Sequence, residues 1–207
     1  MKRTIQILAL LIIVPFIANF TQPGEGENSE KAKATSWSID KAHSNVTFSV
    51  THFFTPVNGT FDDYNGEIYF DPNNLEESSV DVEIMISSID TKNQKRDNHL
   101  QSDDFFHAEK YPKITFKSDK IEKTGEKKYV AHGTLSMRGH SKKIELPFTH
   151  LGTTNHPMKK NTVVTGIKAE TSLSRTAYDV GVGDWASNAV IGDDVDVSIA
   201  MELHSKK

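Results

Sequence analysis

The sequence of 207 residues predicts an all-β fold, an eight-stranded antiparallel up-and-down barrel. Three observations predict it. Apolar and polar residues alternate along most segments, which places one face of each strand on a core and the other in water, as is typical of antiparallel sheets. Clusters of turn-forming residues separate these segments. Several strands are long, and because the open edges of long strands promote aggregation, closure into a barrel is favoured, with a β-sandwich as the second choice.

The elements follow in order along the chain. Alternation marks strands at residues 46–51, 80–86, 144–148, 163–173 and 195–203, with turns at residues 71–74, 123–126, 138–140 and 152–157. Residues 57–70 contain Asn65-Gly66, which forms either a hairpin turn or a bulge within one long strand. Residues 95–106 lack Pro and Gly and predict one short helix, whereas Gly181 and Gly183 predict irregular structure over residues 176–189.

The N-terminal part of the chain is expected to lie outside the barrel. Residues 1–20 combine a basic start with an almost unbroken apolar run, which is typical of a signal peptide. The alternative is an uncleaved anchor, which the shortness of the run disfavours. Residues 21–36 are polar and predict a flexible spacer, and residues 37–205 form one domain. We therefore expect a periplasmic or secreted protein.

Composition argues against several functional classes. The net charge is −4, and no run of Lys or Arg suggests a nucleic-acid partner. The chain has no Cys and no Gly-x-Ser-x-Gly motif, so no nucleophile is expected and the protein is predicted not to be an enzyme. The 9 His residues show no close metal-binding spacing, and no metal or other cofactor is predicted. Metal ligands contributed by separate strands would, however, leave no spacing pattern.

The segment from Arg96 to Phe106 is the strongest functional candidate. Arg96 and His99 lie on one side of a helix, and Arg suits bidentate contact with a carboxylate or phosphate. We expect Arg96, Asp97 and His99 to meet a ligand head group at the barrel mouth, with Phe105 and Phe106 over an apolar tunnel. The alternative is a plug, in which Arg96 and Asp97 only cap the helix and tie it to the barrel rim.

A barrel of about eight strands has room inside for side chains or one slender ligand. Apolar pockets with a few polar groups at one end are the usual form of small-molecule sites. The residues expected to line the tunnel are Phe48, Val50, Phe61, Ile84, Ile86, Leu100, Phe105, Phe106, Phe116, Leu135 and Phe148.

A series of motifs from Trp37 to about Leu203 resembles a known family. The motifs are Trp37–Ser44, Phe48–His52, Gly59–Phe61, Ser88–Thr91, Arg96–Leu100, Asp104–Phe106, Tyr111–Ser118, Gly133–Gly139 and Gly192–Val195. In this order they resemble the YceI-like family of secreted bacterial lipocalin-like proteins, which are described as polyisoprenoid-binding. The resemblance implies a lipocalin-like barrel with a short helix near its mouth, and no established catalytic residues.

The resemblance also implies the ligand and the partners. The expected ligand is a long-chain lipid, namely a polyisoprenoid, an isoprenoid quinone or a fatty-acid-like molecule, carried or sequestered in the cell envelope. A homodimer and proximity to a membrane are further expectations. Two alternatives remain: an enzyme that acts on a lipid or quinone head group through His99, Asp97 or a cross-strand His pair, and a structural or stress-response barrel without a ligand.

Overall fold

The computed structural model describes residues 33–207, so the predicted signal peptide or anchor and most of the predicted spacer lie outside the described residues. The strands are β1 (Ser36–Ile39), β2 (Asn45–His52), β3 (Thr55–Phe61), β4 (Tyr64–Tyr69), β5 (Ser79–Met85), β6 (Ile89–Asp90), β7 (Lys113–Gly125), β8 (Lys128–Met137), β9 (His140–Asn155), β10 (Thr162–Ser174) and β11 (Ile191–Lys206). The helices are α1 (Gln94–Gln101) and the 3₁₀ turns η1 (Leu75–Glu77), η2 (Ile86–Ser88), η3 (Thr176–Tyr178) and η4 (Gly183–Trp185). β1 begins at Ser36, inside the predicted spacer. No helix in the described part of the chain is long and apolar enough to cross a membrane.

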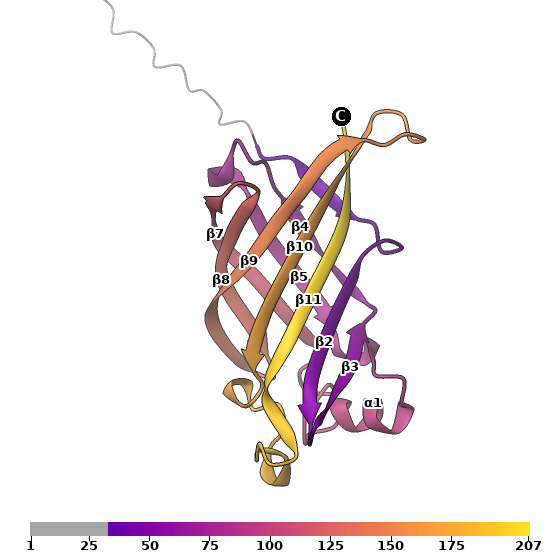
Figure 1. Ribbon diagram of the computed structural model, residues 1–207, viewed down its shortest axis with the longest axis vertical. Coiled ribbons are helices and arrows are strands. Elements are labelled where there is room, and N and C mark those ends of the chain that lie inside the picture. The colour runs from indigo at the N-terminus through magenta and orange to yellow at the C-terminus, as the bar shows by residue number, and fades with distance from the viewer. Residues whose placement is uncertain (1–32) are drawn as a thin grey trace, which may run out of the picture. The chain divides into compact units, whose positions relative to one another are not determined.

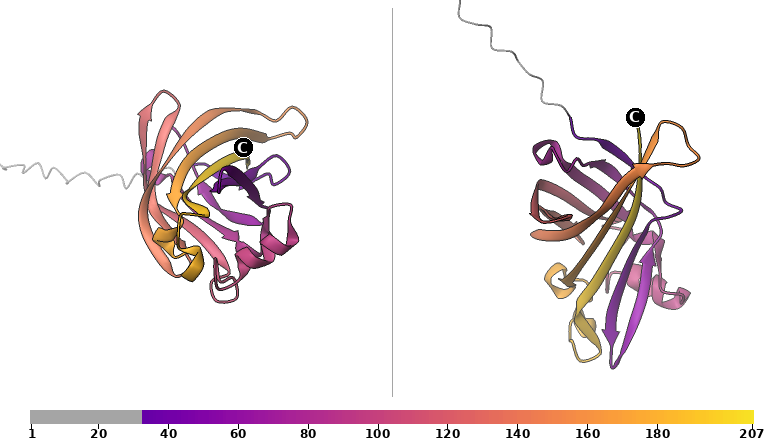
Figure 2. Two further views of the ribbon diagram at one scale, coloured as in Figure 1. Left: turned by 60° about the horizontal axis from the view of Figure 1, so that its bottom comes forward. Right: turned by 45° about the horizontal axis from the view of Figure 1, so that its top comes forward.

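Eight strands close into a ring. In the order β1, β4, β5, β7, β8, β9, β10 and β11, each strand pairs antiparallel with the next, and β11 pairs back to β1. Figures 1 and 2 show the strands curving around a common interior, with α1 at one end and the C-terminus at the other. The predicted eight-stranded antiparallel barrel with a single short α-helix is confirmed.

Three further strands, β2, β3 and β6, extend the sheet beyond this ring. β11 is long enough to pair with β1 near its C-terminal end and with β2 along its first half, as in the pairs Ile39↔Leu203 and Val46↔Ile199. Between β1 and β2 the chain turns at Asp40, whose Oδ1 accepts a hydrogen bond from Ala42 N at 3.0 Å. The β2–β3 hairpin therefore lies at the end of the barrel that also holds α1 (Figure 1).

The structure decides how residues 57–70 fold. Asn65 and Gly66 do not form a hairpin turn, because both lie inside β4 and pair with Glu83 and Val82 of β5. The interruption falls instead at residues 62–63, between β3 and β4. A Cβ on Gly66 would lie 2.4 Å from the Asp81 carbonyl oxygen, so this glycine allows two backbones to approach closely.

Aromatic side chains cluster at the end of the barrel away from α1. The Phe70 ring lies 5.2 Å from the Tyr129 ring and 5.5 Å from the Phe148 ring, measured between centroids. Trp37 Nε1 donates a hydrogen bond of 2.8 Å to the Phe70 carbonyl. Phe70 and Tyr129 are each only 3% exposed. Edge-to-face pairs of this kind add about 0.5–1.5 kcal/mol beyond the area they bury.

His150 joins this cluster and makes folding stability depend on pH. Its ring lies 5.4 Å from the Phe70 ring, and its Nε2 lies 2.9 Å from the hydroxyl of the buried Thr165. Burial, reinforced by the charge of Lys127, lowers the pKa of His150 below its ordinary value. The unfolded chain therefore binds this proton more tightly than the folded chain does. The contribution of neutral His150 to stability is full above the unfolded pKa of about 6.5, and declines as the pH falls from there towards the folded pKa.

We expect urea midpoints to be lower at about pH 5.5 than at about pH 7.5, on either side of the ordinary histidine pKa. The His150→Asn variant should show a smaller difference between the two midpoints, because it lacks the titrating ring. An equal pH dependence in the variant would show that His150 does not cause it.

Candidate functional site

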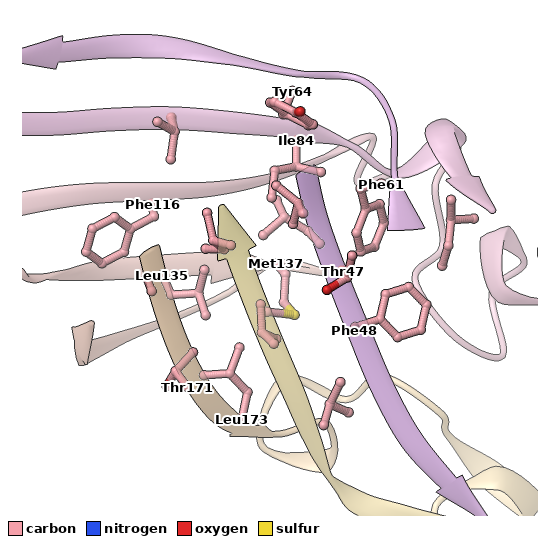
Figure 3. A pocket seen from close by; sticks show the side chains of 18 of the residues that line it. Thr47, Phe48, Phe61, Tyr64, Ile84, Phe116, Leu135, Met137, Thr171 and Leu173 are labelled. Carbon is pink, nitrogen blue, oxygen red and sulfur yellow. The ribbon is translucent and has the colours of Figure 1, made fainter. Parts of the chain in front are cut away.

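The barrel encloses a cavity of about 730 Å³, within the range of about 300–1,000 Å³ that is usual for small-molecule sites. Side chains alternate between the two faces of a strand, so every second residue points inward. On β11 the inward residues that line the cavity are Val195, Val197, Ile199, Met201 and Leu203. Figure 3 shows part of this wall, in which most side chains drawn consist of carbon alone, while Thr47 and Tyr64 carry oxygen and Met137 carries sulfur.

The structure places all but one of the predicted tunnel residues in the cavity wall. Those in the wall are Phe48, Val50, Phe61, Ile84, Leu100, Phe105, Phe106, Phe116, Leu135 and Phe148. The prediction for Ile86 is corrected, because β5 ends at Met85 and Ile86 begins η2. The alternation of the strand stops there, and Ile86, which is 0% exposed, packs in the core without lining the cavity.

Two glycines make room for aromatic rings of the wall. A Cβ on Gly59 would lie 2.4 Å from Cζ of Phe48, and a Cβ on Gly133 would lie 2.7 Å from Cζ of Phe116. Both distances are far below the roughly 3.5–4.0 Å of ordinary carbon contacts. Each ring therefore occupies space that any other residue at the glycine position would fill.

The charged residues of the wall are all basic. Lys95, Arg96 and Arg175 line the cavity, and none of the described lining residues is Asp or Glu. Lys95 and Arg96 belong to α1, and Arg175 directly follows β10, so they reach the cavity from its α1 end (Figure 1). Because charges act more strongly in a low-dielectric surrounding, this end of the cavity favours an anionic or strongly polar group.

Side-chain hydrogen bonds tie the start of α1 to the barrel rim. Asn93 caps the helix, since its Oδ1 accepts from Arg96 N at 3.1 Å. Arg96 donates from Nε to Thr91 Oγ1 and from Nη2 to Thr91 O, both at 2.7 Å, which leaves Nη1 as its remaining donor nitrogen. Arg96 therefore both lines the cavity and holds the helix.

Asp97 does not line the cavity. It is 5% exposed, and its Oδ1 accepts from Thr91 N at 2.9 Å and from Thr91 Oγ1 at 2.5 Å. It is absent from the wall residues, so the prediction that Asp97 meets a head group is corrected. A buried carboxylate is stable only when it is hydrogen-bonded, and these two bonds provide that. These contacts are those expected from the plug interpretation.

The predicted helix of residues 95–106 is shorter than expected, and α1 ends at Gln101. The Ser102 hydroxyl donates to the His99 carbonyl at 2.7 Å and competes with the helical backbone.

His99 lines the cavity, and its Nε2 lies 2.9 Å from Asp104 Oδ2. The His99 ring also contacts the rings of Phe105 and Trp185, each at 5.0 Å. His99 thereby joins α1 to the loop that contains η4.

Sequence reasoning missed the wall residues in and next to the irregular segment, namely Arg175, Tyr178, Val180 and Trp185. Arg175 is 5% exposed, and Nε, Nη1 and Nη2 donate to the carbonyls of Gly192, Val180 and Ile191 at 2.9, 2.9 and 3.0 Å. A signal was present, since large aromatic and charged residues in a loop of a β-protein are often functional.

Tyr178 differs from the other polar groups of the wall. It is 2% exposed, and its hydroxyl has no hydrogen-bond partner among the described residues. Burial raises the pKa of Tyr178, so the phenol stays protonated and keeps its hydrogen as a donor. Buried polar atoms normally have a partner, and an exception calls for an explanation.

Comparison with known proteins relates this barrel to others. Residues 37–203 match the family model described as the YceI-like domain. A UPF0312 protein of Photorhabdus laumondii is 38% identical over 133 residues, which covers 63% of this chain and 69% of that relative.

Two solved structures have the same architecture. The YCEI protein of Campylobacter jejuni is 36% identical, with a TM-score of 0.65 over 82% of this chain and 98% of that one. A polyisoprenoid binding domain from Saccharophagus degradans gives a TM-score of 0.60 over 83% of this chain and 99% of that one. At 13% identity this second likeness shows the fold alone. The family match extends from β1 to β11, and the chain therefore belongs to the YceI-like family.

Proposed function

We propose that this protein binds a long-chain lipid inside its barrel and carries or sequesters it in the cell envelope. The observation that supports this most is the cavity of about 730 Å³ with its apolar wall. Moving an alkyl chain from water into such a wall stabilises binding by about 0.8 kcal/mol per CH₂ group. Polyisoprenoids, isoprenoid quinones and fatty-acid-like molecules all supply such a chain. The Saccharophagus degradans domain, which shares the fold, is described as a polyisoprenoid binding domain.

The ligand is proposed to bind with its head group at the α1 end. Lys95 and Arg96 Nη1 are donors of the wall that the hydrogen bonds described above leave available. Two cations suit a head group that carries acceptor oxygens, such as a diphosphate or carboxylate. We propose a binding role for this end, in which Asp97 takes no part because it is buried and hydrogen-bonded to Thr91.

The alternative of a barrel without a ligand has less support. It requires an interior filled by side chains, and the described residues enclose a cavity. The head-group enzyme has no specific observation in its favour. We propose that the protein acts in the periplasm or outside the cell, near a membrane and as a homodimer, as the family resemblance implies. Cell fractionation and light scattering would test these proposals.

Lipid titration with matched head groups tests the binding proposal. The full chain, stripped of lipid, is titrated with a polyprenyl diphosphate and with the polyprenol of equal length. Both lipids should bind, and the diphosphate should bind more tightly. Lys95→Gln should reduce this difference in affinity, because it removes a cation of the cavity wall. Lys128→Gln, which removes an exposed lysine at the closed end, is the control and should leave both affinities unchanged. Failure of both lipids to bind would refute the proposal.

Replacement of Tyr178 by Phe separates ligand binding from stability. In the ligand-free protein the variant should be more stable by about 1 kcal/mol or more, because it removes a buried donor without a partner. Lipid affinity should not change, with or without acceptor oxygens at the head group, because the buried hydroxyl does not face the cavity. Calorimetric melting and lipid titration measure the two effects. A variant that is less stable and binds equally well would show that the hydroxyl has a partner in the protein.

A further inference from the structure

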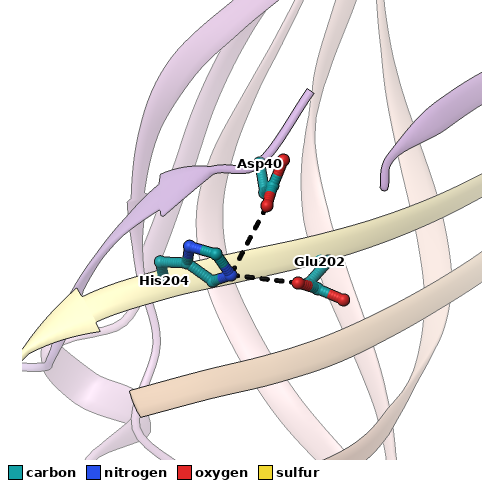
Figure 4. A group of neighbouring side chains, drawn as sticks. All are labelled: Asp40, Glu202 and His204. Carbon is teal, nitrogen blue, oxygen red and sulfur yellow. Dashed lines mark hydrogen bonds and ion pairs between the residues drawn. The ribbon is translucent and has the colours of Figure 1, made fainter. Parts of the chain in front are cut away.

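A second group of chemically active side chains lies on the outside of the barrel, at the end away from α1. Asp40 follows β1 directly, and Glu202 and His204 lie two positions apart on β11 (Figure 4). Leu203, between them, lines the cavity, so Glu202 and His204 share the outer face. The same alternation puts Ile39 in the wall and Asp40 outside. This group is independent of the proposed lipid site.

The donor atoms of Asp40, Glu202 and His204 lie close together. His204 Nε2 lies 3.0 Å from Glu202 Oε1 and 3.6 Å from Asp40 Oδ2. One ligand atom from each of Asp40, Glu202 and His204 lies within 4.8 Å of the others. His43 adds a further nitrogen, because its Nδ1 lies 3.1 Å from Asp40 Oδ2 and 3.9 Å from Glu202 Oε1. Donor atoms of a tetrahedral zinc site, with bonds of about 2.0 Å, are separated by about 3.3 Å.

Backbone bonds hold these side chains in place. Asp40 N donates to Glu202 O at 2.9 Å, and His43 N donates to Asp40 O at 3.2 Å. The Ser44 hydroxyl donates to Glu202 O at 3.3 Å and accepts from Glu202 N at 3.0 Å. The turn of residues 40–44 is thus fixed against β11. Asp40 Oδ1 caps this turn, while Oδ2 faces the histidines.

His156 supports the group without joining it. Its ring packs edge-on against the His204 ring at 5.5 Å. Its Nδ1 accepts from Met158 N at 3.1 Å and from Lys159 N at 3.0 Å, so this nitrogen is not available to a metal. Packing by a neighbouring ring restricts the orientation of His204, as surrounding residues commonly do for metal-binding histidines.

From this geometry we infer that Asp40, Glu202 and His204 bind a divalent transition metal, with Zn²⁺ the best match and His43 turned in as the fourth ligand. Two imidazole nitrogens and two carboxylate oxygens are a donor set that suits Zn²⁺ better than Mg²⁺ or Ca²⁺, which prefer oxygen alone. Binding requires each imidazole to place its proton on the nitrogen that faces away from the metal. The ion would link the turn after β1 to β11, whose pairing closes the barrel. The metal is therefore inferred to stabilise the seam of the barrel.

Another histidine of the same barrel offers a matched control. His132 Nε2 lies 2.9 Å from Glu122 Oε2, and its Nδ1 lies 3.6 Å from Glu145 Oε1. The two carboxylates thus meet opposite nitrogens of one ring, and no single ion can bridge both through it. This cluster has a similar composition to the inferred site, but its donors do not converge.

Zinc titration of the full chain without an affinity tag tests the inference. After treatment with a chelator, the protein should bind one Zn²⁺ per chain in calorimetry, and the ion should raise its melting temperature. His43→Ala and His204→Ala should each weaken binding at least ~10-fold and remove most of the rise in melting temperature. His132→Ala should behave like the unchanged protein. Co²⁺, added in place of Zn²⁺, should give the visible absorption bands of a four-coordinate site.

Two results would overturn the inference: no Zn²⁺ binding by the folded protein, or equal binding by the His43 and His204 variants. His43 lies on an exposed turn, with a side chain that is 66% exposed, so its replacement keeps the fold and the test valid even if the His204 variant unfolds. Lipid binding at the other end should be unchanged by any of these variants, which separates this test from that of the proposed function.

Discussion

Replacement of Thr171 by Phe is expected to weaken lipid binding at least ~10-fold, the factor that corresponds to about 1.4 kcal/mol. Thr171 lines the cavity from β10, and Figure 3 shows it beside Leu173 on the same strand. A ring at this position would occupy space that the proposed lipid chain requires. The loss of affinity should be similar for a polyprenyl diphosphate and for a polyprenol of equal length, because the substitution affects the hydrocarbon chain of the lipid and not its head group.

Ser172→Phe is the matched control for this experiment. Ser172 is the next residue of β10, it is exposed, and its side chain points to the opposite face. Titration of both variants with the same polyprenyl lipid measures the difference. Should the Thr171 variant bind as tightly as the Ser172 variant while both remain folded, the lipid does not occupy the barrel.

Replacement of Arg175 by Ala is expected to lower the free energy of unfolding by about 3 kcal/mol or more. Arg175 is 5% exposed and satisfies three backbone carbonyls, of Val180, Ile191 and Gly192. Without the guanidinium these oxygens lose their donors at the junction of β11 with the loop of η3. A Cβ on Gly181 would lie 2.4 Å from Arg175 Nη1, so the loop is shaped around this side chain.

Urea unfolding monitored by tyrosine and tryptophan fluorescence measures this effect. The free energy of unfolding of Arg175→Lys should lie between those of Arg175→Ala and the unchanged protein. An ammonium keeps the charge but lacks the planar set of donors. Lys168→Ala, on β10, the strand that precedes Arg175, removes only an exposed ion pair with Glu170 and should change stability by less than ~1 kcal/mol. An Arg175→Ala variant as stable as this control would show that the carbonyls find other donors.

Much of the barrel could be predicted because alternation is a local property of the sequence. The run from Val195 to Leu203 alternates without a break, and the structure puts its apolar residues in the cavity wall. Places where a strand stops were harder to predict, because they depend on partners far along the chain. Ile86 continues the apolar pattern of β5, but the backbone turns at this residue so that its N–H can bond to Pro112 O. Gly66 allows two backbones to approach closely, and the sequence alone does not distinguish a glycine in this role from a glycine in a turn.

The site could be predicted only where one short segment carries it. Arg96, His99, Phe105 and Phe106 are close in sequence, and all four line the cavity. Asp97 has the same local setting, yet its burial against Thr91 depends on how α1 docks on the rim. The inferred metal ligands come from the turn after β1 and from the end of β11, so no spacing in the sequence connects them.

Native mass spectrometry of the protein purified from its own host tests whether the barrel carries a lipid. We expect a complex whose excess mass, released on dissociation, corresponds to one long-chain lipid per chain. The Thr171→Phe variant, purified in parallel, should lack this excess mass, and the Ser172→Phe variant should retain it. A wild-type protein that carries no lipid, and takes none up from polyprenyl diphosphate, quinone or fatty acid, would contradict the account.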